Sequence, residues 1–442
     1  MARTIHEKDE RLIHPLHHPQ TVPQTMVFDH AEGIYLHRVD GHKVIDGMSG
    51  LWNVNLGHGR PELAEAAHKQ MLSVAYMSNY SGTGSVTTIE LADRLAGFAY
   101  PDLNSTFFTS GGAESTESAF KTVRWYWKQM GKPNKTTIIS RLRGYHGVTL
   151  AALSATGIPG YWKHFEPVMP GFVHINPPYT YRFAGEVREG ETVGLAAARE
   201  LEEKIEELGA DNVGAFIAEP VIGAGGVIVP PDDYFPRIRE ICDEHDILLI
   251  SDEVITGWGR TGEWFGLHHW GVQPDLMTFA KAITSGYLPL GGIQVHDRIK
   301  DVMDTCPFED RWFHAYTYSG HPTCCAVALA NLDILQAGEY HKKARHAGNY
   351  LLGALRHLEE HDNVGEVRGK GMMLAVELVE DKESRTEAGT AEAVKSTCIE
   401  KGFMPRVVGN LLVMAPPLIS TDAELDRIAD ILAESVEEVH TA

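Results

Sequence analysis

The sequence predicts an α/β protein with a large domain on a mainly parallel sheet and a smaller α+β domain. Three observations favour this fold class. From about residue 60 to residue 330, short apolar stretches alternate with amphipathic helical patterns, which is typical of a parallel sheet covered by helices. After about residue 335 the pattern changes to long amphipathic helices around two strand-like stretches. The chain has 442 residues, 43% of them hydrophobic, which suggests more than one lobe.

The predicted elements follow in chain order. Residues 1–59 form a segment that we expect to join the smaller domain, and residues 33–50 within it predict a hairpin with its turn at Asp40-Gly41. Residues 60–335 form the predicted large domain. Its expected strands are residues 105–110, 135–140, 214–219, 246–251 and 275–280, and its expected helices include residues 117–130, 195–208 and 234–245. Residues 336–442 form the predicted smaller domain, in which helices flank residues 365–379 and 411–418 and the last helix opens with the capping box Thr421-x-x-Glu424.

Composition and charge exclude several classes of function. The net charge of −21 disfavours nucleic acid and anionic membranes as partners. The chain contains no run of 18 apolar residues and no apolar signal-peptide core near its start, so we expect no membrane span. Five cysteines without C-x-x-C spacing favour reduced thiols in the cytoplasm. The 23 histidines include adjacent pairs but not the i, i+4 pair of a zinc helix, so we expect no metal site.

Lys281 is the first candidate for chemistry. It follows the buried stretch 276–280 and lies among the small residues Ala280, Ala282, Thr284, Ser285 and Gly286. One interpretation is a lysine that extends from a strand end into solvent. The small neighbours, however, leave space for a bulky ligand and offer little apolar surface to a lysine stem. A desolvated lysine has a lowered pKa and can act as a nucleophile, as Schiff-base chemistry requires.

Asp252 and Glu253 come directly after the expected strand 246–251. Two carboxylates at a strand end are costly unless one of them meets a cation. A protonated pyridine nitrogen would satisfy Asp252, and a carboxylate that holds this proton makes the ring an electron sink. The alternative is an acidic pair that caps the following turn.

The same stretch contains a glycine pattern, Gly257-x-Gly259-x-x-Gly262, that matches a dinucleotide-binding fingerprint. Asp275 lies near the position expected for the ribose-binding acid. The fingerprint requires a helix directly after the glycines, but residues 263–275 contain two more glycines and a proline. We therefore do not favour a nicotinamide dinucleotide.

Ser110, Gly111 and Gly112 end an expected strand and precede an amphipathic pattern. Small residues before a helix expose backbone N–H groups to a phosphate, and no Gly-Lys-Ser/Thr follows, so a monophosphate ester fits better than a nucleoside triphosphate. Tyr145 lies between glycines after another expected strand, where its ring can stack on a flat heterocycle or pack in the core. A phosphate, an aromatic ring with a basic nitrogen and an aldehyde for Lys281 together describe pyridoxal 5′-phosphate (PLP).

The chain resembles the class III, fold-type I, PLP-dependent aminotransferases, and within them the ω-amino acid and amine:pyruvate transaminases. The resemblance covers about residues 33–425 and is carried by "LLISDEVITGWGRTGEWFG", by the spacing from Asp252 to Lys281, and by "YTYSGHPTCCAVALANL". It implies a fold-type I architecture with PLP as cofactor. Lys281 is then the Schiff-base lysine, which later carries a proton between substrate and cofactor, and Asp252 is the partner of the pyridine nitrogen.

The resemblance also implies how the cofactor is held. Tyr145 and Val254 are expected to cover the two faces of its ring. Thr317 is expected to reach the phosphate of a neighbouring subunit, so that a homodimer is the minimal active unit and a dimer of dimers stays open. The phosphate of the same subunit is expected to contact Ser110, Gly111 and Gly112.

Substrate choice is expected to depend on three residues. In similar transaminases an arginine at the position of Arg406 moves in to bind a substrate carboxylate and moves out for amines without one. Trp52, in "SGLWNVN", resembles a pocket-wall tryptophan. Tyr80 is a further pocket candidate, and Ser81 and Gly82 after it are smaller than the groups that relatives often carry.

The chain departs from the family in "AEPVIGAGG", where Ile222 stands in place of a common glutamine near the cofactor oxygen. Glu219 matches a family glutamate beside the cofactor. The expected activity is the transfer of an amino group from an ω-amino acid, a primary amine or a diamine to pyruvate in two half-reactions. Rivals on the same cofactor are a 7,8-diaminopelargonate aminotransferase, an aminomutase, or an acetylornithine/4-aminobutyrate-type enzyme with another acceptor. A non-catalytic relative is disfavoured because Lys281 and Asp252 are both present.

Overall fold

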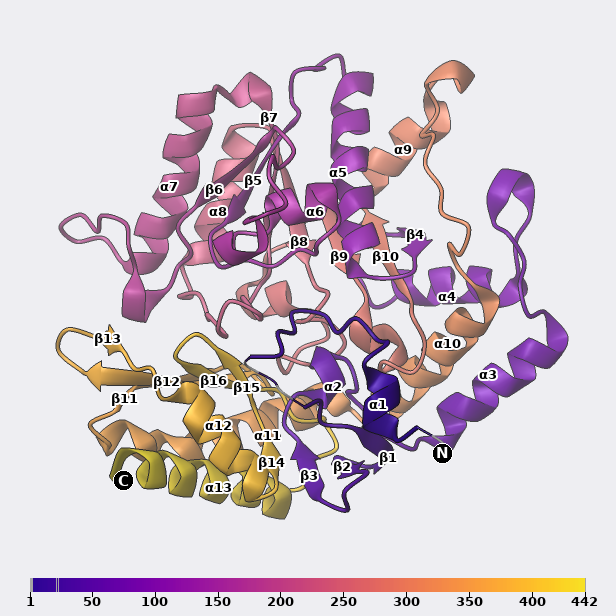
Figure 1. Ribbon diagram of the computed structural model, residues 1–442. Helices are drawn as coiled ribbons and strands as arrows, with labels where there is room; N and C mark the ends of the chain where they lie inside the picture. The colour runs from indigo at the N-terminus through magenta and orange to yellow at the C-terminus, as the bar shows by residue number, and fades with distance from the viewer. Residues whose placement is uncertain (1–2, 21, 23, 442) are drawn as a thin grey trace.

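The computed structural model describes residues 3–20, 22 and 24–441, and it confirms a large α/β domain joined to a smaller α+β domain (Figure 1). The described residues of the large domain form a seven-stranded sheet in the order β4-β10-β9-β8-β7-β5-β6. β10 is antiparallel to both of its neighbours, whereas β9, β8, β7, β5 and β6 run parallel. The strands are β4 (Ser105–Thr109), β5 (Thr137–Arg141), β6 (Phe172–Ile175), β7 (Val213–Ala218), β8 (Leu248–Asp252), β9 (Leu276–Phe279) and β10 (Gly291–Val295).

Helices cover both faces of this sheet, so side chains on both faces of the strands are buried. Apolar residues of α5, α6 and α9 share one core cluster with one face of the sheet. Residues of α4, α7, α8 and α10 share a second cluster with the other face. The helices of this domain are α3 (Pro61–Ser73), α4 (Val86–Ala96), α5 (Gly112–Gln129), α6 (Leu150–Ala155), α7 (Val193–Leu208), α8 (Tyr234–Glu244), α9 (Asp297–Thr305) and α10 (Pro322–Ala337).

The five expected strands are confirmed as β4, β5, β7, β8 and β9, and two further strands complete the sheet. β6 has only four residues, one of them a histidine, and β10 begins with two glycines, so neither shows the longer apolar run that predicts a buried strand. The expected helix 117–130 is part of α5, which begins at Gly112. The side chain of Glu114 accepts a hydrogen bond from Ser110 N at 2.8 Å and so holds the chain just before this first turn.

The smaller domain has its own sheet, in the order β11-β12-β16-β15, with β13 beside β12. The strands are β11 (Val364–Gly369), β12 (Leu374–Asp381), β13 (Thr386–Glu387), β15 (Arg406–Val408) and β16 (Leu411–Met414), and the helices are α11 (Tyr340–Leu355), α12 (Ala391–Glu400) and α13 (Asp422–Thr441). The predicted capping box is confirmed at the start of α13. Thr421 N donates to Glu424 Oε2 at 2.8 Å, and Glu424 N donates to Thr421 Oγ1 at 3.4 Å.

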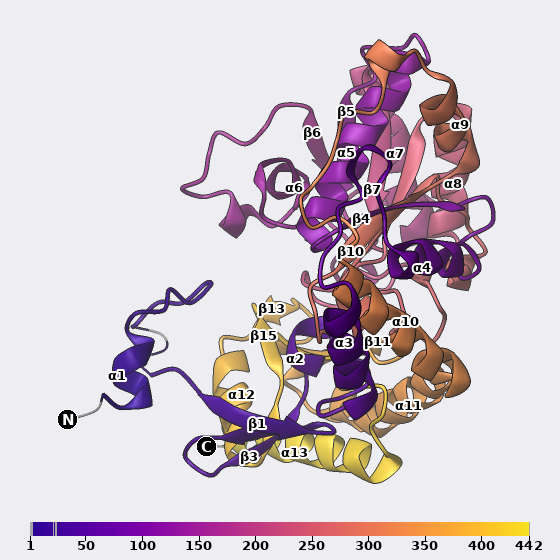
Figure 2. The same ribbon diagram turned by 90° about the vertical axis from the view of Figure 1, so that its right-hand side faces the viewer.

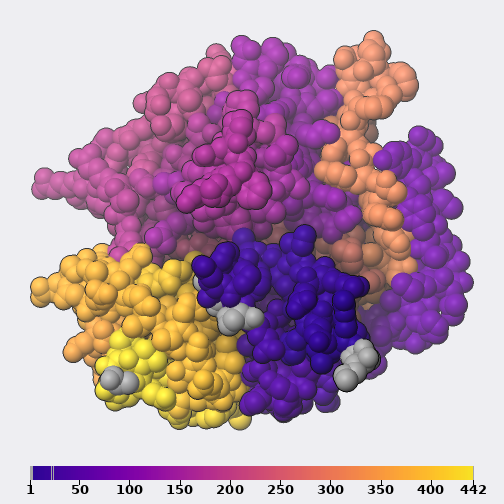
Figure 3. All heavy atoms as spheres, in the orientation of Figure 1, coloured from indigo at the N-terminus to yellow at the C-terminus, as the bar shows by residue number. Residues whose placement is uncertain are grey.

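The N-terminal segment packs beside the C-terminal part of the chain, as Figure 3 shows. The predicted hairpin is confirmed as β2 (Tyr35–Arg38) and β3 (Lys43–Asp46), which pair antiparallel beside β1 (Phe28–Glu32). β14 (Phe403–Met404) adds to β3 in parallel, so the first and last parts of the chain share a sheet. α1 (Ile5–Asp9) has no buried residue and stands apart from the rest of the chain in Figure 2.

The glycine pattern after β8 does not build a dinucleotide site. Residues 254–261 form turns, and no crossover helix follows directly among the described residues. Gly259 and Gly262 have φ values of 91° and 97°, which favour glycine, and the pattern therefore serves the turns. In the part of the chain that the structure describes, every helix is too short or too polar to cross a membrane.

Candidate active site

A cavity of about 180 Å³ lies where five strands of the large sheet end. Parallel strands end at one edge of a sheet, and this edge is where α/β folds bind ligands. Residues after β4, β5, β7 and β9 line it together with the last residue of β8 and those that follow. The lining residues are Gly112, Ala113, Tyr145, His146, Gly147, Val148, Glu219, Asp252, Val254, Ile255 and Lys281.

Lys281 lines this cavity from the second residue position after β9. Its φ of 51° lies in the left-handed region, which costs a non-glycine residue free energy and is found mostly where surrounding structure enforces it. No described residue accepts a hydrogen bond from Nζ. Burial lowers the pKa of Lys281 to about 8, although the negative charges of Asp252 and Glu219 act against this shift. At pH 7 about one amine in ten is then neutral, against about one in three thousand for an ordinary lysine.

Asp252 is held by three donors at the base of the cavity. Its Oδ2 lies 2.7 Å from His146 Nδ1, and both side chains are almost fully buried. Its Oδ1 accepts hydrogen bonds from Thr278 Oγ1 at 3.0 Å and Val254 N at 3.2 Å. A carboxylate fixed in this way keeps lone-pair capacity for a further donor. His146 was not predicted, although its position beside Tyr145 in the loop after β5 was a usable signal.

Glu253 has a different role from its neighbour. Its side chain points into the core and accepts hydrogen bonds from Tyr100, Ser251, Thr256 and the backbone N–H groups of residues 266 and 267. These donors satisfy a buried carboxylate without any cation. The two neighbouring acids therefore have different roles: Asp252 lines the cavity, whereas Glu253 holds the following turns by hydrogen bonds.

Glu219 brings a second carboxylate to the cavity. Its Oε1 accepts from Tyr145 N and its Oε2 from Gly223 N, each at 2.9 Å. Burial is the main reason why the pKa of Glu219 is raised. The two hydrogen bonds join the loop after β5 to the loop after β7, so Glu219 fixes the backbone that presents Tyr145. Val254 lines the same cavity.

The start of α5 provides a place for a phosphate. Gly112 and Ala113 line the cavity, and the first N–H groups of a helix have no intrahelical partner. A Cβ atom at Gly112 would lie 3.0 Å from Val254 Cγ1, so glycine leaves room there for a ligand. An unpaired amine, a carboxylate that can accept one more proton donor, and a helix N-terminus are the three groups that PLP requires. The described residues of this cavity therefore fit PLP.

Two of the predicted site residues lie behind the cavity wall. Trp52 is only 2% exposed and packs with Ile255, which does line the cavity. Its indole N–H is buried without an acceptor among the described residues. Ile222 is fully buried beside Ile228 and Tyr179 and does not line the cavity either.

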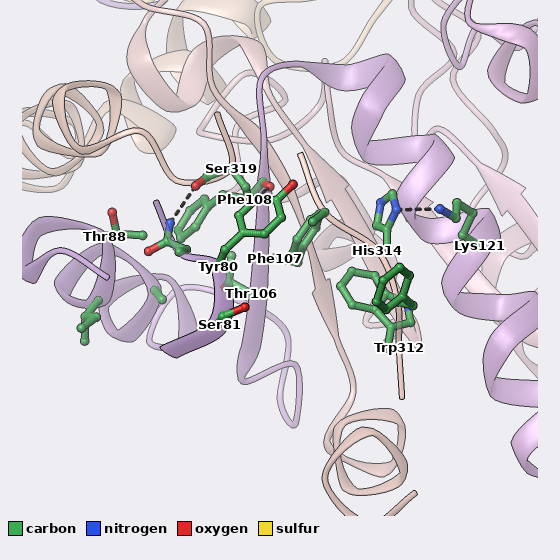
Figure 4. A pocket seen from close by; sticks show the side chains of 15 residues that line it. Tyr80, Ser81, Thr88, Thr106, Phe107, Phe108, Lys121, Trp312, His314 and Ser319 are labelled. Atoms are coloured by element: carbon green, nitrogen blue, oxygen red, sulfur yellow. Dashed lines mark hydrogen bonds between the residues drawn. The ribbon is translucent and has the colours of Figure 1, made fainter. Parts of the chain in front are cut away.

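Tyr80 and Thr317 lie on another face of the molecule. Tyr80 lines a larger cavity, of about 790 Å³, which shares no lining residue with the first and where it lies among Phe107 and Phe108 (Figure 4). Ser81 also lines this larger cavity, whereas Gly82 has open space around its Cα. Thr317 is exposed, and its carbonyl accepts a hydrogen bond from Tyr76 at 2.7 Å. Within one chain these residues do not meet Lys281.

Arg406 begins β15 at the edge of the smaller domain. Its guanidinium is partly buried and has no hydrogen bond or ion pair with any described residue. It is close enough to the cavity for its charge to act on both residues: it adds to the effect of burial, which lowers the pKa of Lys281, and opposes the effect of burial, which raises the pKa of Tyr145. An unpaired arginine beside a cavity is free to bind a carboxylate.

Comparisons with known proteins all indicate aminotransferases. A sequence model described as aminotransferase class-III matches residues 17–436. The putrescine–pyruvate aminotransferase of Pseudomonas aeruginosa is 42% identical, over 93% of this chain and 90% of the relative. The diaminobutyrate–2-oxoglutarate transaminase of Halomonas elongata is 38% identical, over 93% and 90%. The crystal structure of an (S)-enantioselective ω-transaminase from Thermomicrobium roseum superposes with a TM-score of 0.94 at 46% identity, over 98% of both chains.

Proposed function

Because this chain belongs to the class-III aminotransferases, we propose that it transfers an amino group from a primary amine, a diamine or an ω-amino acid to pyruvate. The family is PLP-dependent, and its fold-type I architecture is that of the large and small domains described above. The observation that carries the proposal is the unpaired amine of Lys281, whose pKa burial lowers to about 8, beside the Asp252–His146 pair. When bound, PLP supplies an aldehyde for the amine and a pyridine ring that withdraws electrons from it.

The residues of the cavity then divide the work. Asp252 would hold the proton of a ring nitrogen as an ion pair, and His146 keeps that carboxylate in place. Lys281 Nζ would carry a proton from the substrate carbon to the aldehyde-derived carbon of the cofactor, and a pKa near 8 lets the amine both accept and donate that proton near neutral pH. Tyr145 and Val254 would confine the ring, and the backbone N–H groups of Gly111 and Gly112 would hold the phosphate, since Ser110 N already donates to Glu114.

Pyruvate is the favoured acceptor for two reasons. The relative from Pseudomonas aeruginosa is named for putrescine and pyruvate and is 42% identical to this chain. Arg406 is unpaired and electrostatically coupled to Lys281, so it can bind the carboxylate of pyruvate or alanine and withdraw from an amine without one. The second candidate acceptor is 2-oxoglutarate, which the name of the relative from Halomonas elongata contains.

A homodimer is the proposed active form. A band of exposed apolar side chains covers one face of the chain around Tyr80 and Thr317, and large patches of this kind mark protein interfaces. Tyr76 and Tyr318 in it are in ring contact, and Tyr80, Ile89 and Phe313 line one cavity. A second copy on this face is the partner that would bring Thr317 to a phosphate in the other subunit. The band consists of Met71, Leu72, Val74, Tyr76, Met77, Tyr80, Val86, Ile89, Phe308, Phe313 and Tyr318.

The assembly is tested by light scattering on a charged variant. Ile89→Asp, in the band, should shift the protein from dimer to monomer and lower cofactor retention. Val39→Asp is the matched control, because Val39 is also exposed but lies at the turn of the β2–β3 hairpin. A dimer that survives the change at Ile89 with full cofactor would argue for another interface.

The proposed compartment is the cytoplasm, because the five cysteines are unpaired.

The reaction is tested by following the visible spectrum of the protein with a panel of amines. An absorption band that bleaches with an amine and returns with pyruvate, with alanine as product, supports the proposal. Recovery with 2-oxoglutarate alone would move the acceptor to that keto acid. Lys281→Ala should keep the fold and lose turnover, and normal turnover in this variant would contradict the role of Lys281.

The role of Arg406 is tested separately. Arg406→Ala should raise KM for pyruvate at least about tenfold and change KM for an amine without a carboxylate far less, because only the first loses a charge-assisted contact. Arg427→Ala, on α13 of the same domain, is the control for loss of a surface arginine. Equal losses for both substrates in Arg406→Ala would refute the switch.

A further inference from the structure

Arg260 is a fully buried cation that no carboxylate binds. It lies in the turns after β8, with none of its side chain exposed. Its Nη1 donates to the carbonyls of Met372 at 3.2 Å and Pro416 at 2.6 Å. Its Nη2 donates to Ser49 Oγ at 2.9 Å and Asn55 Oδ1 at 2.5 Å. Burying a charge against neutral acceptors alone is expensive, and burial lowers the pKa of Arg260 to about 9.

These four acceptors come from two segments that are distant in sequence from Arg260. Ser49 and Asn55 belong to the N-terminal segment, whereas Met372 and Pro416 belong to the smaller domain. Further hydrogen bonds connect the same parts of the chain around Arg260, and we call this contact region the joint. Ser49 Oγ donates to the Ala415 carbonyl at 2.7 Å, Asn55 Nδ2 donates to the Trp258 carbonyl at 3.2 Å, and Leu418 N donates to the Asn55 carbonyl at 2.8 Å. The Arg260 guanidinium thus joins the large domain, the smaller domain and the N-terminal segment.

The N-terminal segment held in this joint has a costly backbone. Ser49, Gly50 and Trp52 have φ values of 47°, 65° and 66°, and non-glycine residues in this region cost about 1–3 kcal/mol each. The buried carboxylate of Asp46 accepts from Met48 N at 3.1 Å and Gly50 N at 2.7 Å. Backbone of this kind persists only where its surroundings enforce it, and the α2 (Ser49–Trp52) turn is enforced by Asp46 on one side and Arg260 on the other.

The same segment contacts the loop that carries the reactive lysine. Leu56 N donates to Ser285 Oγ at 2.9 Å, and Ser285 has a left-handed φ of 49°. A Cβ atom at Gly286 would lie 2.9 Å from Asn53 Nδ2, so the segment packs closely on this loop. The chain from Ser285 back to Lys281 is a single turn, with Ser285 N bonded to the Ala282 carbonyl. A displacement of the segment is therefore transmitted to the backbone of Lys281.

We propose that Arg260 is a positioning residue, which holds residues 46–57 between the two domains and thereby sets the loop of Lys281. It does not touch the cavity itself. An arginine is required because its planar fork presents five donors to acceptors in several directions, whereas a lysine has three donors on one nitrogen. The kinetic part of this inference rests on the proposed transaminase function, and the structural part does not.

The structural part is tested by hydrogen–deuterium exchange on the cofactor-loaded protein. In Arg260→Lys we expect amides of residues 46–57 and 281–286 to exchange at least about tenfold faster than in the wild type, because both segments lose the same restraint. Ser49→Ala, which removes one acceptor and keeps the arginine, should give a smaller change in the same two segments. The Ser49→Ala variant keeps the inference testable if Arg260→Lys does not fold.

Lys135→Met is the matched control. Lys135 is also a buried cation, 2% exposed, and its Nζ donates to the carbonyls of Val213, His245 and Asp246 at the other end of the sheet. Its loss should lower stability and leave exchange in residues 46–57 and 281–286 unchanged. Faster exchange in residues 46–57 alone, with residues 281–286 unchanged in both test variants, would overturn the proposal.

Kinetics provide the second readout. Per cofactor-loaded site, kcat/KM should fall at least about tenfold in Arg260→Lys and stay near the wild-type value in Lys135→Met. A purely structural role predicts equal activity per loaded site in both. If the wild type transfers no amino group at all, the proposed function fails, while the exchange experiment still decides the role of Arg260.

Discussion

Replacing Lys281 by methionine should stabilise the cofactor-free protein at neutral pH. Burial lowers the pKa of this amine from 10.5 to about 8, so the folded chain releases the proton more readily than the unfolded chain. Protonated Lys281 therefore opposes folding below pH 8, and this cost declines as the pH rises and is absent above pH 10.5. The difference between the two pKa values corresponds to about 3 kcal/mol. Methionine is of similar length and carries no charge, so it removes the cost and keeps the packing.

The assay is urea unfolding of both cofactor-free proteins at equal protein concentration, since the stability of the proposed dimer would depend on concentration. We expect the methionine variant to gain about 3 kcal/mol at pH 7 and to lose most of this advantage by pH 10. Lys69→Met, an exposed lysine on α3, is the control and should change the free energy of unfolding by less than about 0.5 kcal/mol. Equal stability of Lys281→Met and wild type at pH 7 would refute a strongly lowered pKa at Lys281.

Three further predictions follow from the site and the surface. Asp252→Asn should slow the bleaching of the cofactor band by an amine at least about a hundredfold in single-turnover experiments, because the ring nitrogen loses its ionic partner; a rate near that of the wild type would contradict that role. Glu253→Gln should lower the free energy of unfolding by about 2 kcal/mol, because buried donors lose their acceptor, while activity per loaded site stays unchanged; a selective loss of activity would place Glu253 in the chemistry. With a net charge of −21, the melting temperature should rise when KCl screens self-repulsion, and a temperature independent of salt would argue against this cause.

Much of the fold could be predicted because the signals are local. The buried parallel strands are apolar runs with a polar residue at or soon after their ends, as Asp252 at the end of β8 and Lys281 two residues after β9 show. β10 was missed because Gly291 and Gly292 weaken the strand pattern. Its glycines have a spatial cause, since a Cβ atom at Gly292 would lie 2.5 Å from the ring of Phe279 on the neighbouring strand.

Site residues could be predicted from the sequence only where a reactive side chain lies at or just after the end of an apolar strand. Lys281 and Asp252 follow apolar strands, so their positions were readable from the sequence. The contact between His146 and Asp252 joins residues 106 positions apart, and no local pattern encodes it. The hydrogen bond from Arg260 to Ser49 spans 211 positions, and the glycine pattern around Arg260, which matches a dinucleotide fingerprint that we did not favour, gives no sign of it. Tyr80 lies on the face where we propose that a second copy binds, and a single sequence does not place such a partner.

The bond from Ser49 to the carbonyl of Ala415 spans 366 positions and has a consequence for biosynthesis. A nascent chain on the ribosome exposes Lys281 and the strands around it well before residues 403–418 emerge. Until then, the joint around residues 46–57 lacks the carbonyls of Ala415 and Pro416, and β14 is not available to β3. If such an intermediate bound PLP, the loop of Lys281 would not yet be held in place by the complete joint. Tight binding of PLP therefore requires a chain that includes residues 403–418. A nonsense mutation near codon 400 should leave a product that is synthesised but stays colourless.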